Sequence, residues 1–297
     1  MRNYYQTITI ACCMAMSASP LAIWAQSGDE QGLEIPRNLQ LQQDKDELRK
    51  AYDGWWTASQ KNKEQRMSWY NEAKFGCFIH WGPYSVPAGL WKNKMQSGYT
   101  EHLMRKARIP LEEYKKELIL PFNPTEFDAE EWMRHASEAG MRYFVITAKH
   151  HDGFCLWDTK YTDYKTTAED CPFHEHKNAD IVKSMFDAFR AKGIGIGAYF
   201  SKADWHCPDY WKEDLRKDDL TSRGPSYDPK EYPEVWNRFK EYTKNQVLEL
   251  CENYGKLDIL WFDAGWVSES NGQDIELGKI VEEARKIQPW TMRTAFA

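Results

Sequence analysis

The chain has 297 residues, of which 42% are hydrophobic and 28% charged, and its formal net charge is -6. These proportions are typical of a soluble globular protein, and the length allows one large domain or two small ones. The acidic balance argues against nucleic acid as a partner, because binding phosphates relies on clustered lysine and arginine. Aromatic residues are frequent, with 14 Trp, 16 Tyr and 13 Phe. They indicate either a core or a carbohydrate site, since sugars stack on aromatic rings.

The first 25 residues predict a secretory signal. Residues 7–25 are mostly apolar and small, a positive residue precedes them, and Ala25 is a reasonable cleavage point. A membrane anchor is the alternative, but two serines and Pro20 interrupt the run, which is barely long enough to span a bilayer. We therefore expect a secreted or periplasmic protein that has no membrane association once the signal is removed.

Residues 26–62 are polar and predict a linker followed by a short helix, and residues 63–297 predict one catalytic domain. Five cysteines remain after removal of the signal. They are widely spaced and form no CxxC pair, so they predict buried thiols or at most one disulfide.

Apolar segments that predict buried strands alternate with segments that predict helices. We expect strands at 75–81, 143–149, 194–200, 257–263 and 290–294, and helices at 111–120, 128–139, 181–192, 236–253 and 274–287. Buried strands alternating with helices indicate a parallel sheet covered by helices. A closed (β/α)8 barrel and an open doubly wound sheet both fit this pattern.

Two observations favour the barrel. No Gly-rich phosphate loop follows the first strand, which weakens the case for a nucleotide-binding sheet. Polar residues follow the ends of the strands instead, namely His80, the run from Lys149 to Asp152, Ser201 and Asp263, and barrel active sites gather at that face. We therefore predict an α/β fold of the TIM-barrel type. Closure needs eight strands, so a chain with about five is expected to form an incomplete barrel.

Asp263 is the first candidate for catalysis. The apolar run from Leu257 ends in this carboxylate, immediately before a turn at Ala264 and Gly265. A charged group at the end of a buried strand costs solvation energy unless the protein uses it. Its position therefore predicts a functional carboxylate.

Three histidines, His80, His150 and His151, follow two of the predicted strands and suggest two kinds of chemistry. They suit hydrogen bonding to a hydroxylated ligand, and with a carboxylate they also suit zinc in a metal hydrolase. The metal reading ranks second, because no H-x-H or H-x-x-x-H pair would direct two histidines of one element towards one ion.

Three motifs together resemble the α-L-fucosidases of glycoside hydrolase family 29. They are FGCFIHWGPYSVPA at 75–88, AKHHDGFCLWDTKYTDY at 148–164 and LWFDAGW at 260–266, with FNPTEFDAEEW and GIGAYFS between them. Their order and intervals match the family. The resemblance covers roughly Met67 to Met292, and the last five residues do not continue it.

The resemblance implies a cofactor-free retaining glycosidase that removes terminal α-L-fucose from oligosaccharides or glycoconjugates through an ester on Asp263. It implies that His80, Glu101, His150 and His151 bind fucose and that Tyr199 lies beside the nucleophile at the sugar site. Fucose carries a methyl group, and an aromatic side chain such as Trp266 or Phe78 would receive it. The family often has Trp after the glutamate, where this chain has His102.

The family fold is a barrel followed by a β-sandwich, and its general acid/base lies beyond the strand at 290. Neither the sandwich nor the acid/base is expected on this chain. We therefore expect little turnover from it, or an inert fragment that binds fucose.

Overall fold

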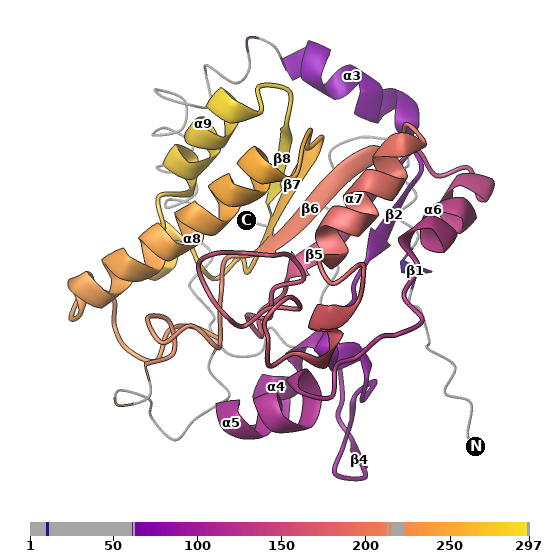
Figure 1. The fold of residues 1–297 in the computed structure, drawn as a ribbon. Helices are drawn as coiled ribbons and strands as arrows, with labels where there is room; N and C mark the ends of the chain where they lie inside the picture. The colour runs from indigo at the N-terminus through magenta and orange to yellow at the C-terminus, as the bar shows by residue number, and fades with distance from the viewer. Residues whose placement is uncertain (1–9, 12–60, 62, 213, 215–222, 296–297) are drawn as a thin grey trace, which may run out of the picture.

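The computed structural model describes residues 10–11, 61, 63–212, 214 and 223–295 (Figure 1). Within these residues, five parallel strands lie side by side in chain order: β2 (Gly76–Ile79), β5 (Tyr143–Lys149), β6 (Gly195–Ser201), β7 (Ile259–Asp263) and β8 (Met292–Ala295). The short strand β1 (Ile10–Ala11) pairs antiparallel with β2. Apart from β1 and Lys61, the predicted signal and the predicted linker and helix of 26–62 lie outside the described residues.

The strand order distinguishes the two sheet architectures. A doubly wound sheet reverses its order at a switch point, whereas here each new strand is added on the same side. Four helices connect consecutive strands and lie on one face of the sheet: α6 (Ala129–Glu138), α7 (Ile181–Ala191), α8 (Pro233–Asn253) and α9 (Leu277–Ile287) (Figure 1). This is the winding of a (β/α)8 barrel. The described sheet is open, with β1 and β8 at its edges, so the prediction of an α/β fold with an incomplete barrel is confirmed.

Caps encoded in the sequence set the ends of two of these helices. The Asp128 carboxylate accepts hydrogen bonds from two backbone N–H groups at the start of α6, at 2.9 and 3.2 Å. Asp180 accepts one from Lys183 N at 2.9 Å at the start of α7. Gly140 and Gly193 follow the two helices with φ of 80° and 74°. The backbone is left-handed there, which glycine adopts without strain, so the helices end as predicted.

Three predicted helices differ from the observed ones in extent or type. The segment 111–120 forms α5 (Leu111–Tyr114) and continues as a π-helix, η3 (Lys115–Ile119). Helix α8 begins at Pro233, three residues early, because proline suits the first turn of a helix. Helix α9 begins three residues late, since Glu276 has a φ of 56° and cannot continue a right-handed helix.

Several short elements were not predicted. They are α3 (Lys63–Ala73), η1 (Pro83–Ser85), β3 (Leu90–Trp91), β4 (Lys94–Met95), η2 (Thr100–His102), α4 (Leu103–Lys106), η4 (Pro172–Glu175) and η6 (Glu269–Asn271). Strands β3 and β4 form a hairpin whose two turn residues, Lys92 and Asn93, both have positive φ, as a type I′ turn requires. Apart from α3, these elements have two to four residues and carry too little periodicity to be found from sequence. Helix α3 has 11 residues, but most of them are polar and they form no apolar stripe.

The two faces of the sheet are packed differently. On the outer face, Phe144 packs against the Phe189 ring of α7 with a centroid separation of 3.9 Å. On the inner face, Val145, Tyr199 and Ile259 form a separate cluster, against which Trp69 of α3 packs. The five cysteines from Cys77 onward are buried free thiols, so of the two possibilities that the sequence left open, buried thiols or one disulfide, the structure has the thiols.

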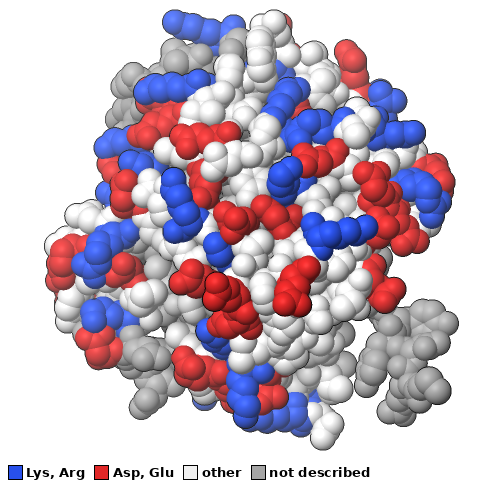
Figure 2. All heavy atoms as spheres, viewed as in Figure 1, with Lys and Arg blue, Asp and Glu red and all other residues white. Residues whose placement is uncertain are grey.

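The surface carries both signs of charge. Lysine and arginine are interspersed with aspartate and glutamate over the face seen in Figure 2, and ion pairs such as Arg134–Glu138 and Lys183–Asp187 join neighbouring turns of α6 and α7. Among the described residues, none of the helices has the length and apolar character needed to cross a bilayer.

Candidate active site

The predicted site residues meet at the C-terminal edge of the parallel sheet. Asp263 is the last residue of β7, and Ser201, the last of β6, lies beside it in the register. His80 follows β2, and His150 and His151 follow β5. Parallel strands bring these ends together, so residues almost two hundred positions apart in the chain surround one carboxylate.

Both oxygens of the Asp263 carboxylate have donors. The hydroxyl of Tyr199 donates to Oδ2, and the backbone N–H of Ala264 donates to Oδ1 at 2.6 Å. Ala264 has a φ of 66°, a left-handed conformation that costs energy for alanine. This conformation turns the N–H back towards the carboxylate. Asp263 is 23% exposed, so a ligand can reach it.

A directed chain of hydrogen bonds leads from His150 to Asp263. The backbone N–H of His151 donates to His150 Nδ1 at 2.8 Å, so the proton of the neutral ring lies on Nε2. That nitrogen is 2.9 Å from the Tyr199 hydroxyl, which in turn donates to Asp263. Burial lowers the pKa of His150 well below its usual value, and the neighbouring histidines lower it further. His150 is therefore a neutral donor near neutral pH.

His151 has the opposite tautomer. Ser201 Oγ donates to the Ala203 carbonyl at 2.6 Å, so it accepts from His151 Nδ1, which is also 2.6 Å away. Burial lowers the pKa of His151 well below its usual value, with His102 the next cause, and the ring is neutral. Its Nε2 is therefore an acceptor, 3.8 Å from Asp263 Oδ2. His151 Nε2 and Asp263 Oδ2 are therefore two neighbouring acceptors, and this arrangement suits a ligand that donates hydrogen bonds from hydroxyl groups.

His80 and Glu101 complete the cluster on the side of β2. One side-chain atom each of His80, Glu101 and His150 lie within 4.8 Å of one another. The His80 ring stacks on Phe78 with centroids 4.8 Å apart. Burial lowers the pKa of His80, although the charge of Asp263 opposes this. Burial raises the pKa of Glu101, and Asp263 adds to the rise.

Trp266 forms the side of the site beyond β7. Its ring lies 4.9 Å from that of His151, and its Nε1 donates to the Arg223 carbonyl at 2.9 Å. The structure thus brings the six other predicted residues together around Asp263.

His102 was not among the predicted ligands. It is buried beside Glu101, with its ring 5.1 Å from that of His151. Arg105 Nη2 lies 3.3 Å from His102 Nδ1, and because arginine is a donor only, His102 carries its proton on Nε2. In the sequence, only its position directly after the candidate ligand Glu101 pointed to His102.

The hydrogen bonds of His150 argue against a metal site. Among the described residues, two groups have the spacing of metal ligands: His80, Glu101 and His150, and His150, His151 and Asp263. Both contain His150, whose two ring nitrogens bond to His151 N and to Tyr199. A metal needs a ring nitrogen with a free lone pair, but Nδ1 of His150 already accepts from His151 N and Nε2 carries the proton, so this arrangement does not fit a resident ion.

Comparisons with known proteins agree with this geometry. Residues 39–296 match the family model described as alpha-L-fucosidase. The chain belongs to the alpha-L-fucosidase family. Within the family it is 30% identical to the tissue alpha-L-fucosidase of Rattus norvegicus, over 67% of this chain and 39% of the rat protein. It is 28% identical to the plasma alpha-L-fucosidase of Homo sapiens, over 71% of this chain and 42% of the human protein.

Solved structures of the family have the same fold. A GH29 alpha-L-fucosidase from Bacteroides thetaiotaomicron, trapped as a covalent intermediate with 2-fluoro-fucosyl fluoride, aligns with a TM-score of 0.65 and 33% identity. The alignment covers 77% of this chain and 48% of that chain. A variant of the Lactobacillus casei enzyme in complex with Fuca(1,6)GlcNAc aligns with a TM-score of 0.61 and 31% identity, over 77% and 69%. This chain therefore spans less than half of the rat, human and Bacteroides proteins.

The match to the fucosidase family model corrects one expectation. We expected the resemblance to end near Met292, but the match continues to residue 296, and it begins at residue 39 rather than 67. Residues 292–295 also form β8, which pairs with β7 from Ile259 to Phe262. The end of the described chain thus belongs to the family fold.

One prediction concerns Asp152, the buried carboxylate of the KHHD motif. Burial raises its pKa to about 7, although hydrogen bonds from Tyr114 and Phe154 oppose the rise. The folded pKa exceeds the unfolded one, so the folded chain holds this proton more tightly and stability falls as pH rises from about 4 to about 7. We expect Asp152→Asn to raise the free energy of unfolding by up to about 4 kcal/mol near pH 8 and hardly at all near pH 4. Urea titrations at both pH values measure this, and equal gains would contradict it.

Proposed function

We propose that this chain carries the fucose-binding and nucleophilic part of a retaining α-L-fucosidase. One carboxylate oxygen of Asp263 attacks the anomeric carbon as the bond to the leaving oxygen breaks, forming a fucosyl ester that water then hydrolyses. The observation that carries the proposal is the Asp263 carboxylate itself. It is fixed by Tyr199 and Ala264 and faces a set of neutral histidines.

The electrostatics of the cluster suit this chemistry. His80, His150 and His151 all have lowered pKa values, so near neutral pH they act as hydrogen-bonding groups without charge. The carboxylate of Asp263 then faces the positive charge that develops on the sugar ring in the transition state. The proposed ligands of the fucose hydroxyls are the three histidines and Glu101, with Trp266 as an apolar wall.

The proposal is tested with a substrate that needs no proton donor. Fluoride leaves without protonation, so 2-deoxy-2-fluoro-fucosyl fluoride is expected to label the chain even without a general acid. Mass spectrometry of the intact chain and of its peptides is expected to find one 2-deoxy-2-fluorofucosyl group, on Asp263. A chain that melts cooperatively and binds L-fucose, yet gains no label, would refute the nucleophilic step proposed for this chain.

A second function is an inert product that binds fucose. This second reading rests on the alignment with the Bacteroides enzyme, which covers 48% of that protein. Calorimetry with L-fucose separates the two readings. Binding without labelling supports the inert product, and binding with labelling supports the enzyme.

The metal-dependent alternative makes a contrary prediction. We expect EDTA to leave L-fucose affinity and labelling unchanged, because hydrogen bonds to His151 N and Tyr199 occupy both ring nitrogens of His150. Calorimetry before and after dialysis against the chelator measures this. A loss that added zinc restores would favour the hydrolase.

The substrates and location follow from the same proposal. We propose terminal α-L-fucose on oligosaccharides or glycoconjugates as the substrate class, and export through residues 1–25 as the route to it. Amino-terminal sequencing of the exported protein tests the second part. A mature chain that starts at Met1 would contradict it.

A further inference from the structure

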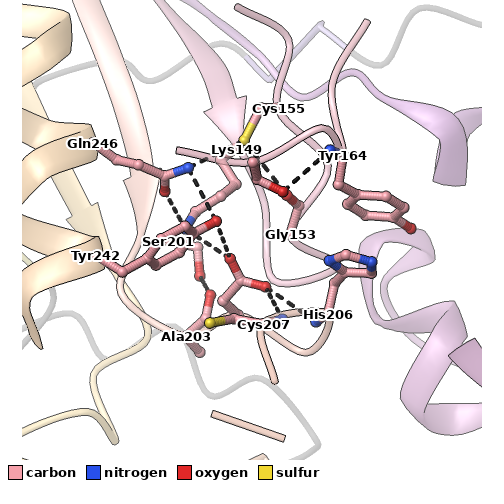
Figure 3. Close-up of polar contacts among 12 residues, drawn as sticks. Lys149, Gly153, Cys155, Tyr164, Ser201, Ala203, His206, Cys207, Tyr242 and Gln246 are labelled. Carbon is pink, nitrogen blue, oxygen red and sulfur yellow. Dashed lines mark hydrogen bonds and ion pairs between the residues drawn. The ribbon is translucent and has the colours of Figure 1, made fainter. Parts of the chain in front are cut away.

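A buried ion pair lies behind the histidines, between the sheet and α8. Lys149 Nζ donates to Asp204 Oδ2 and to Gln246 Oε1, both at 2.9 Å, and Lys149 and Asp204 are each 1% exposed (Figure 3). The Tyr242 hydroxyl also donates to Asp204, at 3.3 Å. Removing two charges from water is costly, and apolar residues often replace such a pair without loss of stability. The proposed chemistry gives this ion pair no role, so the burial of its two charges requires another explanation.

The register of β5 gives an explanation for the buried ion pair. Thr147 pairs with Tyr199, but Lys149 pairs with the next residue of β6, Phe200, so β5 carries one extra residue in a bulge. The bulge places Lys149 on the outer face with Phe200, and its Nζ lies 4.4 Å from the Phe200 ring centroid. His150 then points inward to Tyr199. Regular alternation from Thr147 would place residue 149 inward and His150 outward.

Asp204 holds the neighbouring loops to each other. Its Oδ1 accepts from the backbone N–H groups of His206 and Cys207, at 3.0 and 2.8 Å. Between the two loops, Trp205 N donates to the His151 carbonyl at 2.7 Å. Gly153 has a φ of 81°, and a Cβ there would lie 2.2 Å from Asp204 Oδ1. The turn that follows His151 is therefore built around this carboxylate.

We propose that Lys149 and Asp204 are positioning residues for the fucose site. Their ion pair keeps the β5 bulge in the register that directs both His150 and His151 towards Asp263. The inference rests on the proposed function, because the ion pair acts through two of the histidines assigned to fucose. Without Asp204, the ammonium of Lys149 loses the carboxylate that it contacts on the outer face, whereas the inner face holds the carboxylate of Asp263.

The main test is Asp204→Asn, compared with the double variant Lys149→Met/Asp204→Asn. In the single variant, Lys149 is left without its counter-ion, and we expect L-fucose affinity to fall by at least about tenfold as the histidines shift. In the double variant, neither position carries a charge and the methionine side chain at position 149 lies beside the rings of Phe200 and Tyr242, so we expect affinity within about threefold of the original chain. Calorimetry well below the melting temperature measures both.

A merely structural role predicts a different outcome. If Asp204 acts only by ordering its own loop, the double variant binds as poorly as the single one, and the inference is overturned. It is also overturned if Asp204→Asn binds L-fucose as the original chain does. Glu249→Gln is the matched control, since Glu249 is a buried carboxylate on α8 that accepts from Trp157 and from Lys160 N. We expect it to lower the melting temperature without changing affinity.

A second comparison avoids unpaired charge altogether. Lys149→Ser/Asp204→Asn lacks the long side chain that holds position 149 on the outer face, so we expect it to bind about tenfold more weakly than Lys149→Met/Asp204→Asn. Equal affinities would contradict the inference even if Asp204→Asn does not fold.

A spectroscopic readout separates this inference from the proposed function. Nitrogen-15 NMR of the ring nitrogens is expected to find the Nε2–H tautomer for His150 and the Nδ1–H tautomer for His151 in the original chain. We expect Asp204→Asn to lose both fixed tautomers. If the original chain does not bind L-fucose, the proposed function fails, but the change in tautomers still tests the positioning role.

Discussion

Replacing Asp263 by Asn is expected to abolish formation of the fucosyl ester and to slow hydrolysis of α-L-fucosyl fluoride by at least about 10³-fold. The amide keeps the size of the carboxylate and one acceptor oxygen, so the fold and L-fucose binding are expected to remain. It has no nucleophilic charge, however, and cannot form the ester. Fluoride release and intact mass after treatment with the 2-fluoro analogue measure the two effects.

Asp258→Asn is the matched control, because Asp258 immediately precedes the same strand. Its Oδ2 accepts from Ile196 N at 2.9 Å and has no part in the proposed chemistry. We expect the label to persist in this variant. Asp263→Ala with azide adds a positive test, since azide in place of the carboxylate is expected to give fucosyl azide of the opposite anomeric configuration. Labelling of Asp263→Asn at the original rate would mean that another residue is the nucleophile.

The alternation of strands and helices was readable because it depends on local chemistry. Asp128 and Asp180 are helix caps, and Gly140 and Gly193 end the same helices. Apolar runs form the parallel strands, which have four to seven residues each. Their order in the sheet was not encoded in this way. The barrel winding was inferred from polar residues at strand ends, and the register between neighbours then confirmed it.

The site was predicted as a set of residues, but not as an arrangement. Adjacent histidines on a strand should point to opposite faces of the sheet. The sequence indicated only that a turn after Asp152 could direct both side chains to the same side. The bulge between Thr147 and Lys149 directs His150 inward, and the turn at Gly153 brings in His151. A bulge depends on pairing with the neighbouring strand, so a single sequence does not reveal it.

Buried polar partners were equally hidden. Asp204 and Gln246 lie 55 and 97 residues from Lys149, and in the sequence they have the character of ordinary surface residues. Their burial follows from the tertiary arrangement of the β6 loop and α8. Sequence patterns therefore identified the groups that face the ligand, but not the groups that support them from behind.

Tyr199→Phe is expected to slow ester formation by about 10- to 100-fold while changing L-fucose affinity by less than about threefold. The hydroxyl stands between His150 Nε2 and Asp263 Oδ2, so its removal deprives the nucleophile of a donor and leaves His150 facing a ring edge. Burial and the charge of Asp263 raise the pKa of Tyr199 well above its usual value. It therefore remains a donor throughout the assay range, and the rate loss should not vary between about pH 6 and pH 8.

Labelling rates with 2-fluoro-fucosyl fluoride at several pH values measure this effect. Tyr254→Phe is the matched control, because the Tyr254 hydroxyl donates to the carboxylate of Asp180 at 2.7 Å in the same kind of bond, at the end of α8. It is expected to lower stability without altering the labelling rate. If both variants label at the original rate, the hydroxyl of Tyr199 only fills space beside Asp263. If Tyr199→Phe instead loses L-fucose binding, the tyrosine holds the sugar rather than the nucleophile.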